Sequence, residues 1–239
     1  MSFGALEIHD IDGVEITVEP WSWRFAVDRR DEIDRHFAWR QRDRASMWNG
    51  RVLLLNRYKI SGNALRGACF ETDFASFVAW RDWDFADRAV ANVFAAAALQ
   101  GADGGYLVGE MAADTANAGL LYFPCGTPDP NDVDAGMLDL EESVSRELME
   151  ETGIGIDTLD AAPGWCLVRD RGFLALIKRL TARENAEVLR SRILSNLAKQ
   201  PHPELADVRI VRGRADLDPR MPRFVVTYFE EVWRKEGAI

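Results

Sequence analysis

The sequence has little cysteine, little histidine and no long apolar run, and each shortage excludes a class of protein. Its 239 residues include three cysteines and three histidines, and no CxxC or Cys/His spacing indicates a zinc site or a disulfide framework. The most apolar run, residues 93–99, is too short to cross a bilayer. Residues 1–12 contain no basic n-region, so we expect no signal peptide and a reducing, cytoplasmic location.

The chain also lacks a net basic charge. Its 39 acidic and 29 basic residues leave a formal net charge of -10 at pH 7. A chain of that sign repels phosphate backbones and anionic lipid unless a basic patch is segregated. We therefore expect neither nucleic acid nor a membrane as a partner.

What the chain does have is enough apolar material for a large core and a change of pattern near residue 90. Hydrophobic residues make up 47% of the chain, which excludes a mainly disordered protein. The patterns predict strands over residues 14–18, 51–60, 65–71, 120–123 and 208–211, hairpins over residues 91–110 and 165–180, and helices over residues 29–44, 72–83, 139–153, 182–199 and 223–235. We interpret residues 1–90 as an α+β extension packed on an α/β main domain of residues 91–239.

The helix expected before Gly153 carries an unusual set of charges. At 100° per residue, Glu147, Glu150 and Glu151 share an arc of about 100°. Repulsion between such neighbours costs roughly 0.2 to 0.5 kcal/mol per pair, so stability alone would not assemble them. The apolar stripe of the same helix includes the position of Glu151 and has Glu147 at its edge; the stripe consists of Leu140, Val144 and Leu148.

Clustered carboxylates in or beside an apolar stripe need a partner. Oxygen ligands suit a hard cation such as Mg²⁺, which keeps several waters and takes substrate phosphates as further ligands. The pattern therefore indicates metal-assisted phosphate chemistry. The alternative, an acidic face in contact with solvent, stays open, although such a face would lie opposite the stripe.

At these residues the sequence resembles the Nudix hydrolases, whose signature is GX5EX7REUXEEXGU, where U is aliphatic. Every specified position of its second half is matched, by Arg146, Glu147, Leu148, Glu150, Glu151, Gly153 and Ile154. The first half of the signature is not matched, because Asp132 stands at its glycine position and Leu138 at its glutamate position. Gly126 matches the loop glycine better and implies a six-residue insertion. Asp139 either does part of the work of the missing glutamate or only caps the helix.

The resemblance implies an α/β/α sandwich with a mixed central sheet, and a bound Mg²⁺ with Mn²⁺ as the alternative cation. Its ligands would be Glu147, Glu150 and Glu151, helped by the loop backbone near Gly126. Arg146 would orient a glutamate through a charge-assisted bond.

Nudix enzymes cleave a nucleoside diphosphate linked to another moiety, so the resemblance implies a small-molecule nucleotide substrate. The catalytic set would be Arg146, Glu147, Glu150 and Glu204. Within it the general base would be a helix glutamate, Glu147, or a loop carboxylate, Glu204. Family members often dimerise, which implies a homodimer.

The residues ahead of the main domain resemble those of the UDP-sugar-hydrolysing branch of the family. The similarity rests on residues 48–51, 66–67 and 72–77. It implies that UDP-glucose or UDP-galactose is cut to UMP and a sugar 1-phosphate, with Arg51 and Arg66 binding the diphosphate. The tryptophans of this extension fill a core or subunit interface, or stack on a base or sugar.

Two other interpretations stay open. The departures at Asp132 and Leu138 favour a catalytically weak Nudix-fold module that binds a nucleotide or a protein partner. A structural domain with an aromatic-rich interface is the third, and it predicts that an apolar residue at position 151 stabilises the fold.

Overall fold

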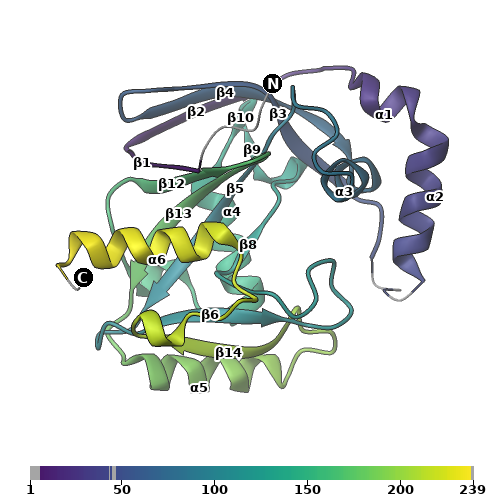
Figure 1. Ribbon diagram of the computed structural model, residues 1–239. Coiled ribbons are helices and arrows are strands. Elements are labelled where there is room, and N and C mark those ends of the chain that lie inside the picture. Colours follow the sequence, from purple (N-terminus) through teal and green to yellow (C-terminus); the bar gives the residue numbers. More distant parts are fainter. Residues whose placement is uncertain (1–5, 43, 45–46, 238–239) are drawn as a thin grey trace.

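The larger of the two β-sheets is mixed. The computed structural model describes residues 6–42, 44 and 47–237, and there this sheet has the strand order β1-β12-β13-β5-β6-β14 (Figure 1). Strand β13 pairs in parallel with β5, while the other pairs in this order are antiparallel. The six strands are β1 (Glu7–Ile11), β5 (Asn92–Gln100), β6 (Tyr106–Met111), β12 (Trp165–Asp170), β13 (Phe173–Thr181) and β14 (Leu205–Val211).

The apolar run of the sequence is strand β5, and it lies inside this sheet. Residues 93–99 are all buried, as is typical of a strand covered on both faces. Short strands extend the sheet beside it: β7 (Leu121–Tyr122) pairs with β6, β8 (Cys125–Gly126) with β5 and β11 (Asp160–Ala161) with β13.

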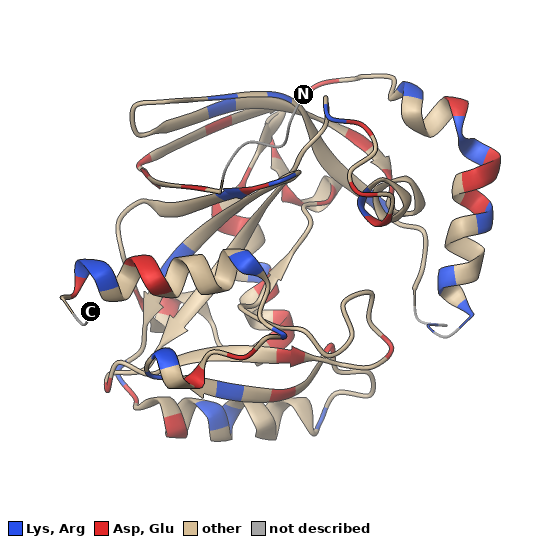
Figure 2. Ribbon diagram, in the orientation of Figure 1, with Lys and Arg blue, Asp and Glu red and all other residues tan. Residues whose placement is uncertain are grey.

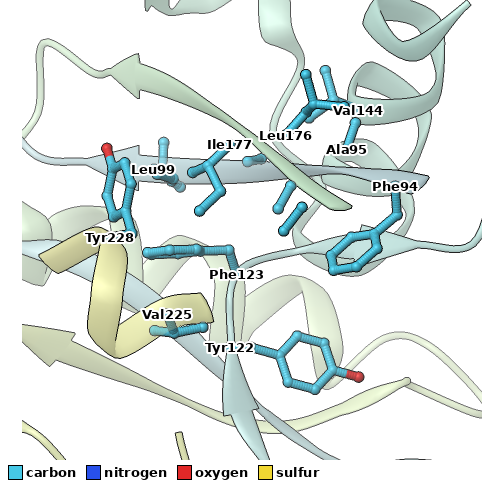
Figure 3. Packing of buried hydrophobic residues seen from close by; sticks show 14 of the residues in the cluster. Phe94, Ala95, Leu99, Tyr122, Phe123, Val144, Leu176, Ile177, Val225 and Tyr228 are labelled. Carbon is cyan, nitrogen blue, oxygen red and sulfur yellow. The ribbon is translucent and has the colours of Figure 1, made fainter. Parts of the chain in front are cut away.

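Helices cover both faces of the central strands. Helix α4 (Leu140–Thr152) packs on β5, and Val144 lies there with Ala95 and Leu176 (Figure 3). Helix α6 (Arg223–Lys235) brings Tyr228 to Phe123 on the other face, and α5 (Ala186–Leu197) packs on β14. The predicted mixed α/β class, with a mixed sheet between helices, is confirmed.

The second sheet has the order β3-β4-β2-β10-β9 and its own aromatic core. Trp23 and Trp80 are buried in that core, as the core interpretation predicts, whereas Trp39 and Trp48 are exposed. The strands are β2 (Gly13–Val18), β3 (Arg51–Ser61), β4 (Ala64–Asp73), β9 (Val133–Asp134) and β10 (Met137–Leu138), and the helices beside them are α1 (Arg24–Asp28), α2 (Arg30–Gln41) and α3 (Phe74–Asp82).

The two sheets exchange strands across residue 90. Strand β1 pairs with β12 of the larger sheet, while β9 and β10 join the sheet built mainly from the first 90 residues. Leu55 and Ala91 also exchange two backbone hydrogen bonds, of 2.8 and 3.0 Å. The two parts are therefore bound together by backbone pairing, and the division at residue 90 stays a prediction.

Most predicted element ends are confirmed, and one hairpin is not. Asp73 caps α3 by accepting from the Ser76 N–H, and α4 ends at Gly153, whose φ is +71°. The hairpin predicted over residues 91–110 forms only at its turn, because β5 and β6 pair at Gln100–Tyr106 alone. Beyond that point β8 pairs with β5, and β7 with β6, so the two strands separate.

Two sequence expectations concern location and partners. In the part of the chain that the structure describes, no helix is long and apolar enough to span a membrane; residues 1–5 of the N-terminal segment lie outside that part. Arginines are interspersed with Asp and Glu along α2 (Figure 2). The cytoplasmic location and the exclusion of nucleic acid stay predictions.

Candidate functional site

Helix α4 presents its carboxylates as the sequence pattern predicts. Glu151 lies within the buried stripe and is 2% exposed. The Glu147 side chain at the edge is 12% exposed, and that of Glu150 is 59% exposed. Asp139 accepts hydrogen bonds from the N–H groups of Glu141 and Glu142, so it caps the helix. The interpretation of Asp139 as a helix cap is confirmed. Asp139 and Gly153 fix where α4 begins and ends, which sets the positions of the three glutamates along the helix.

The short strand β8 lies directly beside these carboxylates. The Cys125 N–H donates to Glu151 Oε1 at 3.2 Å. A Cβ atom added to Gly126 would lie 2.2 Å from Glu147 Oε1, so only glycine allows the loop and this carboxylate to approach so closely. The structure thus brings Gly126 to the helix glutamates.

Arg146 has a partner that the sequence analysis did not find. Its Nη2 donates to both carboxylate oxygens of Asp132 at 3.0 Å, and its Nε donates to Oδ1 at 3.3 Å. Its Nη1 lies 3.0 Å from Glu147 Oε1 and 3.3 Å from Glu150 Oε2. Asp132 is buried, at 1% exposure. One guanidinium therefore joins the insertion to the helix carboxylates.

The carboxylates of this region shift one another's protonation. Burial raises the pKa of Glu147 to about 7, against the lowering effect of Arg146, and Glu150 and Glu204 add to the rise. Burial, Glu147 and Glu204 raise the pKa of Glu151 well above its ordinary value. The pKa of Glu204 is raised by burial and by the charges of Glu150 and Asp114. The loop carboxylate Glu204 is therefore close enough to raise the pKa of Glu147 and Glu151 through its charge.

The donors present fit an open Mg²⁺ site better than a closed cage. Among residues 6–42, 44 and 47–237, no group of three or more His, Cys, Asp or Glu side chains is arranged so that it could hold a metal ion. The cation between Glu147 and Glu150 is instead the Arg146 guanidinium. Glu151 Oε2 is buried without a hydrogen-bond partner. Mg²⁺ typically takes one or two carboxylates, waters and substrate phosphates, and these oxygens suit that role.

A cavity of about 990 Å³ opens beside the carboxylates. Its lining includes Glu147, Glu150, Glu204 and Gly126. Six phenylalanines from both parts of the chain form much of the rest, namely Phe74, Phe77, Phe85, Phe94, Phe173 and Phe224. This size and mixed lining are typical of a small-molecule site.

The two arginines predicted to bind a diphosphate lie in different places. Arg51 lines the cavity, while its Nε contacts Glu71 Oε1 at 2.5 Å. Arg66 pairs with Glu15 at 2.8 Å on an exposed part of the second sheet and is not among the residues that line the cavity. The structure thus brings Arg51, and not Arg66, to the candidate site.

The raised pKa of Glu147 predicts an unusual pH dependence of stability in the presence of a chelator. Between its ordinary value of 4.5 and about 7, the folded state binds more protons than the unfolded state, so stability falls as pH rises. The difference corresponds to on the order of 3 kcal/mol. Carboxylates with lowered pKa, such as Glu19 and Asp73, lose their contribution only below 4.5 and 3.8, outside this window.

Thermal unfolding at pH 5, 6, 7 and 8 with a chelator measures this effect. We expect the melting temperature to fall across the series and Mg²⁺ to restore it most at pH 8, because a bound cation favours the ionised carboxylate. Glu147→Gln should flatten the profile. A wild-type profile that is flat or rises with pH contradicts the burial argument.

Comparison with known proteins gives only structural matches of low identity and low TM-score. No protein-family model matches the chain, and no curated protein matches it. The RenU Nudix hydrolase from M. smegmatis is 15% identical, with a TM-score of 0.39, and the match covers 62% of this chain and 86% of that one. The MutT protein from Methanosarcina mazei Go1 is 18% identical, with a TM-score of 0.39 and coverage of 61% and 95%. NrtR from Shewanella oneidensis is 18% identical, with a TM-score of 0.39 and coverage of 60% and 62%.

Proposed function

We propose that this chain is a Mg²⁺-dependent Nudix-type hydrolase that cleaves the diphosphate bond of a nucleoside diphosphate linked to another moiety. One observation carries the proposal: Glu147, Glu150, Glu204 and Gly126 all line one cavity of about 990 Å³. The second half of the signature, residues 146–154, supplies the two helix glutamates, and the loop glycine packs against one of them.

Each side chain has a role that follows from its position. Glu147, Glu150 and Glu151, with the backbone at Gly126, would hold Mg²⁺, or Mn²⁺ in its place. When bound, such an ion polarises phosphoryl oxygens and activates water. Arg146 holds Glu147 and Glu150 in place. Glu204 lines the same cavity from another loop, and it or Glu147 takes a proton from the attacking water.

The substrate we favour is a nucleotide sugar such as UDP-glucose, giving UMP and a sugar 1-phosphate. This choice rests on the resemblance of residues 48–51, 66–67 and 72–77 to the UDP-sugar-hydrolysing branch. Arg51 at the cavity wall can hold a phosphate of any such substrate with two hydrogen bonds. The phenylalanines supply faces on which a base can stack. Arg66 does not reach the cavity and is not part of this proposal. A homodimer stays a prediction.

The direct test measures product release from UDP-glucose, ADP-ribose, NADH, diadenosine polyphosphates and dNTPs, with and without Mg²⁺. We expect Mg²⁺-dependent cleavage of at least one compound and favour UDP-glucose. Cleavage of another compound would keep the hydrolase and replace the substrate class. No cleavage, together with a rise in melting temperature on adding a compound, would support the catalytically weak binding module. That module is favoured by one observation, the guanidinium between Glu147 and Glu150.

Arg51→Ala should raise the KM of the substrate about 10-fold, the effect of losing roughly 1.4 kcal/mol of binding, with kcat nearly unchanged. Arg57 is the matched control, because it lies on the same strand, is similarly exposed and pairs with Glu19 at 2.6 Å outside the cavity. Steady-state kinetics of Arg51→Ala and Arg57→Ala make the comparison. Equal KM values in the two variants would remove Arg51 from the substrate site.

A further inference from the structure

We infer that Asp132 is a positioning residue for the metal-binding carboxylates, in place of the signature glutamate that this chain lacks at Leu138. The inference rests on the proposed function and adds a residue to its site. Counted back from Arg146 without an insertion, Asp132 stands at the signature's glycine position, although Gly126 is the glycine that lies against Glu147. The structure places a fully buried carboxylate there and points it at Arg146.

Asp132 is itself held firmly. It lies in a short 3₁₀ turn, Pro130–Asp132, whose capping box joins it to Asp129. Its Oδ2 accepts the Asp129 N–H at 2.9 Å, and its backbone carbonyl accepts the Asp139 N–H at 2.8 Å. Asp129 and Asn131 line the cavity. The turn therefore fixes the carboxylate between the cavity loop and the start of α4.

The geometry divides the guanidinium of Arg146 between two tasks. Asp132 takes Nε and Nη2, which leaves only Nη1 for Glu147 and Glu150. Without Asp132, the whole guanidinium would be free to turn onto the two glutamates and compete with Mg²⁺ for their oxygens. With Asp132 present, only Nη1 of Arg146 contacts the oxygens of Glu147 and Glu150. It orients these oxygens and leaves them open to Mg²⁺.

Stability alone is a poor account of this pair. A buried aspartate and arginine gain little over well-packed apolar residues of the same volume, because both charges must be desolvated. Leu138, at the signature's glutamate position, is buried in the apolar core and offers no carboxylate. The buried carboxylate that binds Arg146 therefore comes from the turn inside the insertion and not from position 138.

A double-mutant cycle tests whether Asp132 acts through Arg146. The four proteins are wild type, Asp132→Asn, Arg146→Gln and the double variant, and the readouts are Mg²⁺ affinity by calorimetry, kcat and nucleotide KM. With Arg146 present, we expect Asp132→Asn to weaken Mg²⁺ binding and lower kcat by about 10- to 100-fold, as for other residues that orient metal ligands. The KM should not change, because Asp132 does not line the cavity. In the Arg146→Gln background, the same substitution should change both Mg²⁺ affinity and kcat by less than about twofold.

Asp139→Ala is the control for stability, since it removes the cap of α4 without touching Arg146. It should lower the melting temperature and leave Mg²⁺ affinity unchanged. If Arg146→Gln does not fold, Arg146→Lys replaces it, because lysine keeps the charge without the forked contact. Equal losses with and without the Arg146 substitution would overturn this inference alone. A wild-type chain that neither binds Mg²⁺ nor cleaves any compound would overturn the proposed function and this inference with it.

Discussion

Replacing Glu151 with leucine is expected to make the metal-free protein more stable and the enzyme inactive. Glu151 is fully buried, its Oε2 has no partner, and its pKa is raised well above the ordinary value. Folding at pH 8 therefore requires this carboxyl to take up a proton or to stay buried and charged. An apolar side chain of similar size should stabilise the chelator-treated fold by on the order of 1–3 kcal/mol, even though the Cys125 N–H then loses its acceptor.

The same change should abolish Mg²⁺ binding and hydrolysis. A metal supplies several kcal/mol of transition-state stabilisation, so its loss corresponds to roughly a 10²- to 10⁴-fold fall in rate. Urea unfolding with a chelator, Mg²⁺ calorimetry and turnover measure the three effects. Glu142→Leu is the control, because Glu142 lies on the same helix but is exposed and does not line the cavity. It should change none of them.

Two combinations of results would contradict different parts of the account. A Glu151→Leu protein that is stabilised and still fully active would support the structural-domain interpretation of this carboxylate. A variant that is destabilised in the presence of the chelator would show that the buried carboxyl contributes to the fold, through the Cys125 hydrogen bond. Only a stabilised, inactive variant indicates a residue kept for function at a cost in stability.

Helix α4 could be predicted from the sequence because its ends and its buried face depend on residues within the helix or next to it. A period of 3.6 residues places Glu151 in the apolar stripe and Glu147 at its edge, and both exposures agree. Asp139 and Gly153 mark the ends by their preferences for capping and for positive φ. The neighbouring loop glycine, Gly126, was predicted from the resemblance of its loop and against the signature's spacing, which puts Asp132 at the glycine position.

The Asp132–Arg146 pair could not be predicted in the same way. It depends on a 3₁₀ turn inside the insertion, where no periodic pattern exists, and on that turn meeting a helix residue fourteen positions later. Strands β9 and β10 are two residues long, and β10 pairs with a strand far away in the sequence. Such pairings are decided by packing rather than by local propensity.

The arginines show the same limit. Arg51 and Arg66 both lie on strands of the second sheet, and neither sequence context shows which one faces the cavity. The answer depends on where each strand ends relative to the larger sheet. Arg51 begins β3 beside the cavity loop, where the Leu53 N–H donates to the Pro128 carbonyl at 2.7 Å, whereas Arg66 pairs with Glu15 of β2.

Glu204→Gln is expected to lower kcat by about 10²- to 10⁴-fold, the usual contribution of a general base, with little change in Mg²⁺ affinity. Glu204 lines the cavity from the loop before β14, and the Ala112 N–H donates to its backbone carbonyl at 2.8 Å, which anchors that loop. A bound cation would hold Glu147 in its ionised form and occupy its oxygens. Glu204, whose pKa is raised by burial and by Glu150, is then the carboxylate best placed to accept a proton.

The pH profile separates this role from that of Glu147. A base must be deprotonated to work, so kcat/KM should rise with pH through the raised pKa of Glu204, and Glu204→Gln should remove that rise. Glu147→Gln should instead lose Mg²⁺ affinity and kcat together, because Glu147 lies against Gly126 and Arg146 where the cation would bind. Glu184→Gln, which alters an exposed glutamate paired with Arg192 outside the cavity, is the control. If Glu204→Gln keeps its kcat within about threefold, Glu204 is not the base, and Glu147 is the remaining candidate.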